Sequence, residues 1–511
     1  MVIKHLLIFP VLFYSCSCNK EYSFTRPDQQ PPVPSLHTYY VDGATGNDQN
    51  DGLSLARAWK TIQQSFNAAQ PGSTVVIRGG TYYEELVVNV SGKPDHLITF
   101  TNYAQEKVMI DGSKIRGNTI LSITDRGFLV FKNLAIQNIT RNNARGILVV
   151  ASPNGAAGAL YFRNIRFQNI NWTNNAQAIP GANDNAQPFI VLGRGLTQDN
   201  AISNLVIDSC EFSHNITGFS ESLSVDGNVD GFFITHNKVH DNTNIGIAAE
   251  GHYGTSATAS LDQAREGVIS ENVCYNNVSL YATSGGIYVD GGRDIRVDRN
   301  TSFQNGYGIE VGNEKDGTTS NISVTNNLIY RNKVSGLAIG GYDPKTTGQV
   351  VDCIFRNNSF YQNNTNLDGS GELYITKASR CVIGNNVFYT NNQNLLFSLA
   401  DILPQSGISL DYNDWFTVGA DAGKTWINWR SRQFNSFKDY RTGTRQEAHS
   451  IFSDPLFSNV GTPIPDLHLQ STSPCLQQGN PAWIMLPTER DYDGKPRVVN
   501  GKADMGAYQR Q

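Results

Sequence analysis

The stretch ITHNKVHDN at residues 234–242 recurs along the chain as a nonapeptide, with an apolar residue first and asparagine fourth and ninth. The other copies begin at Ile207, Ile269, Val297, Val324, Phe355 and Ile383, and the copy at Ile207 carries Cys210 in place of the first asparagine. Successive starts are 27, 35, 28, 27, 31 and 28 residues apart, so a coil of about 27 residues repeats and the longer intervals hold insertions. This period, with β-rich coils, predicts a solenoid.

Inside each copy, the first and sixth residues are apolar and the two asparagines flank bends, as a coil wall with inward side chains requires. Strands of neighbouring coils lie about 4.8 Å apart, so asparagines of successive coils can hydrogen-bond in ladders. The seventh position forms an aromatic column that includes His240, which is therefore expected to be structural. The five cysteines beyond Cys18 are expected to be buried wall residues rather than metal ligands.

The composition favours a β protein and argues against nucleic acid as a partner. The 511 residues are 39% hydrophobic and 17% charged and include 47 Gly, too apolar for disorder and too rich in Gly and Asn for a helical protein. The formal net charge is −5 and no basic stripe is visible, so a surface that neutralises phosphates is missing from the sequence.

Residues 1–17 are expected to be a lipoprotein signal peptide, because Lys4 and His5 precede the apolar run LLIFPVLFY and the small residues SCSC. FYSCSCNK resembles a bacterial lipobox, which implies lipidation of Cys16 or Cys18. Residues 18–37 are polar and Pro-rich and are interpreted as a tether. The sequence thus predicts an exported protein, lipid-anchored to the bacterial outer envelope or cell surface, or periplasmic, that meets the membrane only through its anchor.

The repeat resembles the right-handed parallel β-helix of secreted bacterial carbohydrate-active enzymes, both polysaccharide lyases and glycoside hydrolases. The ends of the chain agree, since YYVDGATGNDQ and an amphipathic helix near residues 54–69 look like the usual entry, and SPCLQQGNP, DYDGKPR and DMGAYQ like the usual closure. The resemblance implies an all-β, single-stranded, pectate-lyase-like solenoid with an N-terminal capping helix. We expect the cap and first coils at 38–115, the repeats with the active site at 116–400, and the last coils and closure at 401–511.

A second strand follows each nonapeptide, and these strands align as LSVDGN, IAAEGH, IYVDGG, IEVGNE and LAIGGY. Side chains alternate across a strand, so the first and third positions face inward and the second and fourth face solvent. The fourth column then reads Asp226, Glu250, Asp290, Gly312 and Gly340. Each acid precedes a glycine, which is also the pattern of an ordinary turn.

The turn interpretation does not explain why three carboxylates lie about 5 Å apart, where they repel one another. Such a row raises the pKa of a member or binds a cation. We expect Gly312 and Gly340 to leave a bare floor beside the acids, and Tyr288 and Tyr342 to wall a groove for a sugar ring, so that these four residues bind substrate.

Hydrolysis of a glycosidic bond needs two carboxyl groups, which this row offers. The run YVDGG followed by GIEVGNE resembles the catalytic stretch of β-xylosidases of glycoside hydrolase family 120. The resemblance implies Asp290 as nucleophile and Glu314, or else Glu310, as acid/base. The row of acids adds Glu250 and Asp226 as further catalytic candidates. We therefore predict an extracellular glycoside hydrolase that uses paired carboxylates in an outer groove on a polysaccharide or oligosaccharide, without a cofactor.

Two other functions stay open. A Ca²⁺-dependent polysaccharide lyase acting on uronate glycans would hold Ca²⁺ with Asp226, Glu250 and Asp290 and would need a Lys or Arg base. The cations available are Lys315, Arg293, Lys345 and Lys377, and no motif distinguishes one of them. A non-catalytic glycan-binding β-helix would gain nothing from crowded carboxylates. Hydrolysis is favoured because acids are many and a base is not distinguished.

Overall fold

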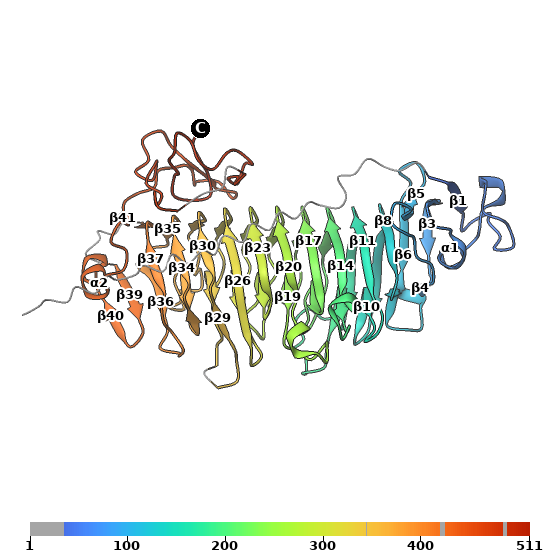
Figure 1. Ribbon diagram of the computed structural model, residues 1–511, viewed down its shortest axis with the longest axis horizontal. Coiled ribbons are helices and arrows are strands. Elements are labelled where there is room, and N and C mark those ends of the chain that lie inside the picture. The colour runs from blue at the N-terminus through green and yellow to red at the C-terminus, as the bar shows by residue number, and fades with distance from the viewer. Residues whose placement is uncertain (1–34, 344, 419–424, 484–487) are drawn as a thin grey trace, which may run out of the picture.

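The protein is an elongated stack of coils, seen in a computed structural model that describes residues 35–343, 345–418, 425–483 and 488–511 (Figure 1). The expected signal peptide, the lipidation candidates Cys16 and Cys18 and most of the tether lie outside the described residues. Within the described ranges, no helix is long and apolar enough to cross a membrane.

Each coil gives one strand to each of three parallel sheets, named here sheets I, II and III. Sheet I contains β1 (His37–Val41), β2 (Ser73–Ile77), β5 (Ile98–Asn102), β8 (Gly127–Lys132), β11 (Ala157–Arg163), β14 (Ile202–Asp208), β17 (Val229–Thr235), β20 (Arg265–Ser270), β23 (Arg293–Asp298), β26 (Thr318–Thr325), β29 (Gln349–Val351), β30 (Ile354–Arg356), β33 (Ala378–Ser379), β34 (Val382–Gly384) and β37 (Ser409–Asp411).

Sheet II carries the candidate site described below. It contains β4 (Leu86–Val88), β7 (Thr119–Thr124), β10 (Ala144–Ala151), β13 (Ala186–Gly193), β16 (Leu223–Gly227), β19 (Ile247–Glu250), β22 (Gly285–Asp290), β25 (Tyr307–Gly312), β28 (Ser335–Ile339), β32 (Leu373–Ile375), β36 (Leu395–Leu399), β39 (Trp426–Trp429) and β40 (Arg432–Phe434). All its neighbouring strands pair in parallel except β39 and β40, which form an antiparallel end.

Sheet III holds the middle of each nonapeptide. It contains β3 (Gly80–Tyr82), β6 (Val108–Asp111), β9 (Ala135–Thr140), β12 (Arg166–Asn171), β15 (Glu211–Ser213), β18 (Lys238–His240), β21 (Val273–Tyr275), β24 (Thr301–Phe303), β27 (Leu328–Tyr330), β31 (Ser359–Tyr361), β35 (Val387–Thr390), β38 (Asp414–Thr417) and β41 (Ile451–Phe452). A separate hairpin joins β42 (Phe457–Asn459) to β43 (Asp466–Leu469). The architecture is the right-handed parallel β-helix that the repeat predicts.

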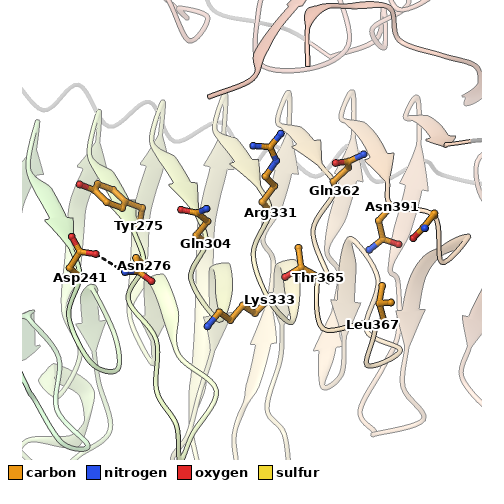
Figure 2. A pocket seen from close by; sticks show the side chains of 11 residues that line it. Asp241, Tyr275, Asn276, Gln304, Arg331, Lys333, Gln362, Thr365, Leu367 and Asn391 are labelled. Carbon is orange, nitrogen blue, oxygen red and sulfur yellow. Dashed lines mark hydrogen bonds between the residues drawn. The ribbon is translucent and has the colours of Figure 1, made fainter. Parts of the chain in front are cut away.

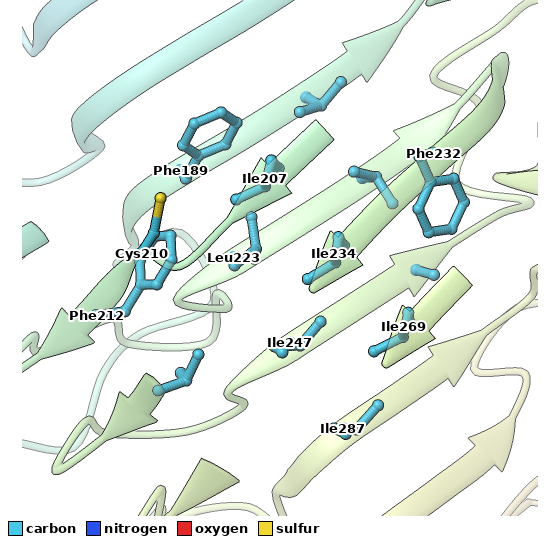
Figure 3. Close-up of a cluster of buried hydrophobic side chains, with 14 of the residues drawn as sticks. Phe189, Ile207, Cys210, Phe212, Leu223, Phe232, Ile234, Ile247, Ile269 and Ile287 are labelled. Carbon is cyan, nitrogen blue, oxygen red and sulfur yellow. The ribbon is translucent and has the colours of Figure 1, made fainter. Parts of the chain in front are cut away.

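The core is a set of columns in which the same position of successive coils carries similar apolar side chains (Figure 3). Ile207, Ile234 and Ile269 are register partners on sheet I, and Leu223, Ile247 and Ile287 are register partners on sheet II. All six side chains are fully buried. Burial at about 25 cal/mol per Å² of apolar surface makes these columns the main stabilising contribution of the stack.

The predicted asparagine ladders are confirmed. The fourth-position ladder runs from Asn237 to Asn413, with each Nδ2 donating to the Oδ1 of the next coil at 2.9–3.1 Å. The ninth-position ladder runs from Asn215 to Asn363 with the same contacts at 2.8–3.3 Å. Each ladder ends on a buried glutamate, because Asn363 donates to Glu372 and Asn413 donates to Glu447.

The corners are formed by the residue before each ladder asparagine. Third-position residues such as His236 and eighth-position residues such as Asp241 have φ near +55°, the left-handed region that non-glycine residues seldom adopt. The hydrogen bonds of the following asparagine hold this conformation in place. The aromatic column is also confirmed, since His240 stacks on Tyr275 at 4.7 Å between ring centroids and Tyr275 on Phe303 at 4.8 Å.

The predicted N-terminal capping helix exists but is shorter than residues 54–69. Only Ile62–Ala68 form helix α1, because Thr61 caps it by accepting a hydrogen bond from the backbone N–H of Gln64, while Trp59 pairs with Val41 in a β-bridge. Phe66 of α1 packs on Phe100 at 4.7 Å between ring centroids and closes the first coil. Short 3₁₀ turns occur at Leu55–Arg57, Gly112–Lys114, Gln198–Asn200 and Ala259–Leu261.

At the other end, helix α2 (Phe437–Thr444) covers the last coils, and Tyr440 packs on Phe397 and Phe434. The sequence did not predict this helix. The chain after β41 then returns along the stack and packs against it (Figure 1), with Arg356 paired to Glu489 at 2.5 Å. The five cysteines of the described residues are buried free thiols, as expected of wall residues.

Candidate active site

A pocket of about 400 Å³ lies on the outer face of sheet II. Its walls come from strands β10, β13, β16, β19 and β22 of sheet II, from the turn before β16, and from the loops after β19 and β25. Five carboxylic acids line it, which are Glu221, Asp226, Glu250, Asp290 and Glu314. Four of these five are residues that the sequence predicted to be catalytic candidates.

The predicted column of acids is confirmed by the strand register. Asp226 is the register partner of Glu250. On the next coil, Ala248 is the register partner of Tyr288, and counting two residues further along both strands aligns Glu250 with Asp290. The backbone N–H of Gly251 donates to the carbonyl of Asp290 at 2.8 Å, in keeping with this alignment. The acids therefore share one outward face on three successive coils.

This outward face is covered rather than open to solvent, which differs from the expectation. Asp290, Tyr288 and Asp226 are only 3%, 4% and 5% exposed. The cover is the loop of residues 251–263, whose shape depends on Asp262: its carboxylate accepts from the backbone N–H groups of Gly254 at 2.7 Å and Ser256 at 2.8 Å. The loop docks on the neighbouring turn, where the Ser256 hydroxyl donates to the carbonyl of Gly195 at 2.9 Å.

Tyr253, on this loop, links two of the acids. Its hydroxyl donates to Asp290 Oδ2 and lies 3.4 Å from Glu314 Oε2. The backbone N–H of Glu314 donates to Asp290 Oδ1 at 2.7 Å, so the loop after β25 folds back over β22. The outer side of Glu314 is exposed while its carboxyl group faces the pocket. Lys315 Nζ lies over the Tyr253 ring, 4.7 Å from the centroid.

The other predicted site residues lie differently. Of the predicted substrate-binding residues, only Tyr288 lines the pocket. Gly312 is not a bare floor, because a Cβ there would lie 3.0 Å from the Tyr288 hydroxyl, and one at Gly340 would lie 2.4 Å from Thr376 Oγ1. Gly312 is buried and Gly340 is half-buried, and at both positions the space beside the backbone is taken by neighbouring atoms. Glu310 and Tyr342 also lie outside the pocket lining.

Burial raises the pKa of every acid in the pocket. It raises the pKa of Glu221 to about 8, of Asp226 to about 6 and of Asp290 to about 7. Burial, followed by repulsion from Glu221 and Asp226, holds the pKa of Glu250 well above its ordinary value. Burial likewise raises the pKa of Glu314, although the Tyr253 hydroxyl and Lys315 act in the opposite direction.

Two oxygens of the cluster lack a hydrogen-bond partner in the described part of the chain, namely Asp226 Oδ1 and Glu250 Oε1. An unpaired buried carboxylate oxygen favours the protonated form of its group. Asp290, in contrast, accepts two hydrogen bonds that favour its ionised form. The pocket therefore places a carboxyl group whose hydrogen bonds favour the ionised form beside others whose burial favours the protonated form, which is the pairing that general acid/base chemistry uses.

The four cations considered as lyase bases do not line this pocket. Lys377 donates to the carbonyl of Thr347, and Arg293 pairs with Asp294 at 3.0 Å. Among the described residues, the one basic side chain in the lining is Arg145, from β10.

Glu221, Tyr253 and Arg145 are site residues that the sequence reasoning missed. Glu221 lies two positions before the aligned strand at Leu223, so extending the alignment backward by two residues would have found it. Arg145 lies on a coil before the first recognisable nonapeptide. Tyr253 belongs to an insertion that does not follow the repeat, and the sequence holds no signal for its position.

A second, larger hollow of about 730 Å³ runs across several coils beside sheet III (Figure 2). Its outer row consists of eighth-position residues, including Asn276, Gln304, Arg331 and Gln362. One acid lines it, Asp241, which accepts a hydrogen bond from Asn276 at 2.5 Å. Without a second carboxyl group, this hollow does not offer the acid/base pair found on sheet II.

In the ranges that the structure describes, no group of three or more His, Cys, Asp or Glu side chains has the arrangement that holds a metal ion.

A family model and the structure of a pectate lyase agree with the fold. The family model described as right handed beta helix region matches residues 248–362. The structure of pectate lyase Pel9A aligns with a TM-score of 0.50 at 15% identity, covering 94% of this chain and 98% of that one. That of a GH136 lacto-N-biosidase from Eubacterium ramulus aligns with a TM-score of 0.47 at 15% identity, covering 77% and 67%.

The chain is thus a right-handed β-helix protein with a covered, acid-lined pocket on one sheet. It is 31% identical over 431 residues to the uncharacterized protein YwoF of Bacillus subtilis (strain 168), covering 82% of this chain and 88% of that protein. At this identity and coverage, the chain belongs to the same family as YwoF.

Proposed function

We propose that the protein is a glycoside hydrolase that cleaves an oligosaccharide or polysaccharide in the sheet II pocket. The observation that carries the proposal is the shared contact of Tyr253 with Asp290 and Glu314. These two contacts to one hydroxyl leave the Asp290 Oδ2 and Glu314 Oε2 atoms no more than about 6 Å apart, which is compatible with the spacing of about 5–5.5 Å in retaining glycosidases and shorter than the roughly 6.5–9.5 Å of inverting ones.

In this mechanism Asp290 is the nucleophile. Its two hydrogen bonds, from Tyr253 and from the backbone N–H of Glu314, favour the ionised form that must attack the anomeric carbon. Glu314 protonates the leaving glycosidic oxygen, and then takes a proton from the water that releases the sugar from Asp290. Glu314 is suited to both steps because its carboxyl group faces the pocket and its outer side contacts solvent.

Glu250 is the second candidate for the acid, because its Oε1 is buried without a partner and its pKa lies well above the ordinary value. Both features favour a carboxylic acid that holds its proton. Glu310 does not line the pocket, so it is not proposed as the acid/base.

The lyase alternative has less support, because Lys315, Arg293, Lys345 and Lys377 all lie outside the pocket lining. A purely binding role also has less support, because five crowded carboxyl groups with raised pKa values destabilise a surface that only binds sugar.

The test is product analysis on xylan-type, arabinan and uronate-containing glycans, with and without a chelator. We expect products that have gained water, and turnover that survives the chelator. Asp290→Asn should lower kcat by about 10³-fold or more while leaving the unfolding midpoint within a few degrees. Asp316→Asn, an exposed change two residues beyond Glu314, is the matched control and should keep full activity. Unsaturated products that vanish with the chelator would contradict the hydrolase assignment.

Glu314→Gln and Glu250→Gln identify the proton donor. Loss of the acid slows glycosides with poor leaving groups far more than activated aryl glycosides, since an activated leaving group departs without a proton. We expect this pattern for Glu314→Gln, with azide restoring turnover through a glycosyl azide. The same pattern in Glu250→Gln alone would assign the role to Glu250.

The proposal includes export and a lipid anchor at Cys16 or Cys18. We expect metabolic labelling with palmitate in the bacterial host to give a labelled wild-type protein, and Cys16→Ala or Cys18→Ala to remove the label. Labelling that persists in both single variants, or an unlabelled wild type, contradicts a single lipidated cysteine in this segment.

A further inference from the structure

Arg145 is the one basic side chain among the described residues that line the pocket, and no acid forms an ion pair with it. Its Nε donates to Gln187 Oε1 at 2.9 Å. The two terminal nitrogens of the guanidinium have no hydrogen bond or ion pair with any described residue. Arg145 is half-buried, and Gln187 lines the pocket beside it. The fork of donors is therefore held in one orientation and left free toward the pocket.

The surroundings of Arg145 oppose its charge instead of balancing it. Burial and the neighbouring Arg194 both lower the pKa of Arg145, and no carboxylate acts in the other direction. None of the five acids that line the same pocket forms an ion pair with the guanidinium or raises its pKa. A half-buried cation of this kind is stabilised when an anion binds it, and a planar guanidinium suits the oxygen pairs of carboxylate and sulfate groups.

The position of Arg145 separates it from the proposed reaction. Strands β10, β13, β16, β19 and β22 are successive neighbours in sheet II, so Arg145 and Asp290 lie four coils apart. At about 4.8 Å per coil, this is about 19 Å along the axis of the solenoid. A group bound by Arg145 therefore belongs to a different sugar unit from the one that Asp290 attacks.

We propose that Arg145, oriented by Gln187, binds an anionic substituent of the glycan, a uronate carboxylate or a sulfate ester, on a sugar unit remote from the reacting bond. The proposed hydrolase thus acts on an acidic glycan. The inference rests on the proposed function for the glycan nature of the ligand, and its first test involves no bond cleavage.

The test is protection of Arg145 from phenylglyoxal, which modifies free guanidinium groups, measured peptide by peptide by mass spectrometry on the whole protein. Galactose, galacturonic acid and galactose 6-sulfate are the probes, because they share a ring and differ in the charged group. We expect labelling of Arg145 to slow about tenfold with a charged probe and to stay unchanged with galactose. Whichever acid protects identifies carboxylate or sulfate as the ligand.

Arg166 is the internal control, because it is paired with Glu211 at 2.9 Å on sheet III, away from the pocket. Its labelling should not respond to any of the three sugars. Failure of Arg145 to react with phenylglyoxal, equal protection by galactose, or no protection by either acid overturns the proposal.

Steady-state kinetics of Arg145 variants separate this inference from the proposed function. On an acidic substrate, Arg145→Gln should raise KM about tenfold or more with kcat nearly unchanged, and Arg145→Lys should recover part of the loss. Arg166→Gln should match the wild type. If Arg145 is protected by a charged sugar but no glycan is cleaved, the hydrolase assignment fails and the anion site stands. If Arg145→Gln cleaves an acidic glycan with wild-type KM, the anion site fails and the hydrolase stands.

Discussion

Tyr253 is the side chain on which the chemistry of Asp290 depends most directly. Its hydroxyl donates to Asp290 Oδ2, and this hydrogen bond lowers a carboxyl pKa that burial and Glu314 raise. The same hydroxyl also contacts the carboxyl group of Glu314, so it bridges the two groups that the proposed reaction uses. Tyr253 is itself 38% exposed, so its position comes from these contacts and from its loop rather than from burial in a core.

Tyr253→Phe should therefore shift the pH profile. Activity requires ionised Asp290, so it rises with pH through the pKa of Asp290, which is about 7. Loss of the donor raises that pKa, and the acid limb of kcat/KM should move upward by about one pH unit. Tyr342→Phe is the control, because Tyr342 is 69% exposed outside the pocket lining. An unmoved acid limb in Tyr253→Phe contradicts the role given to this hydrogen bond.

Glu221 links the site to stability. Burial raises its pKa in the folded protein to about 8 from an ordinary value of 4.5, so the folded state binds its proton more tightly than the unfolded state. Stability from this group is present below about pH 4.5 and is lost as the pH rises toward 8.

Glu221→Gln should remove this pH-dependent loss of stability, because a glutamine side chain does not ionise. We expect the free energy of unfolding at pH 8 to rise by about 2 kcal/mol, and to change little at pH 4. Urea denaturation at the two pH values measures the effect. Equal changes at both pH values would mean that packing, rather than ionisation, explains the result.

The loop of residues 251–263 is the element that turns a column of acids into an enclosed site. Its internal contacts converge on Asp262, and it docks on residues more than 60 positions earlier, as in the bond from Ser256 to Gly195. His252 adds a further attachment, because its Nε2 accepts a hydrogen bond from the backbone N–H of Thr318 at 3.4 Å. None of these contacts follows the period of the coils, so the repeat carries no information about them.

Asp262→Ala should release this loop without unfolding the coils. We expect kcat to fall about tenfold or more because Tyr253 loses its position, and limited proteolysis to cut within residues 251–263. The unfolding midpoint should change little, since the core columns of β19 and β20 remain. A variant that resists proteolysis and retains its kcat would show that Asp262 does not order the loop.

The whole molecule depends on repetition, and its asparagine ladders make that dependence testable. Asn300 accepts from the backbone N–H and the Nδ2 of Asn272, and donates to Ile269 and Asn327. Asn300→Ala leaves buried donors and acceptors of two neighbouring coils unpaired, so it should cost about 3–4 kcal/mol of unfolding free energy. Asn392→Ala, an exposed change, should stay within about 0.5 kcal/mol of the wild type in the same denaturation experiment.

The features that the sequence predicted are those that repeat. The sheets, the ladders, the stack around His240 and the register of Asp226, Glu250 and Asp290 all follow from a side chain recurring at one position of a coil. The cover over sheet II, the contact of Tyr253 with Glu314 and the helix α2 occur once each. A floor at Gly312 was inferred from the missing side chain alone, and the ring of Tyr288 from the neighbouring coil fills that space.

The ladders also give the solenoid a direction. Every asparagine presents its oxygen to the coil before it and an N–H to the coil after it, so the amide dipoles of a ladder point the same way along the axis. At the start of the ninth-position ladder, Asn215 Oδ1 accepts a hydrogen bond from the backbone N–H of Ile170. At the last coils, the unpaired donors need acceptors, which Glu372 and Glu447 supply. A coil can therefore be duplicated inside the stack without changing its hydrogen bonding, whereas the two ends are chemically different and cannot be exchanged.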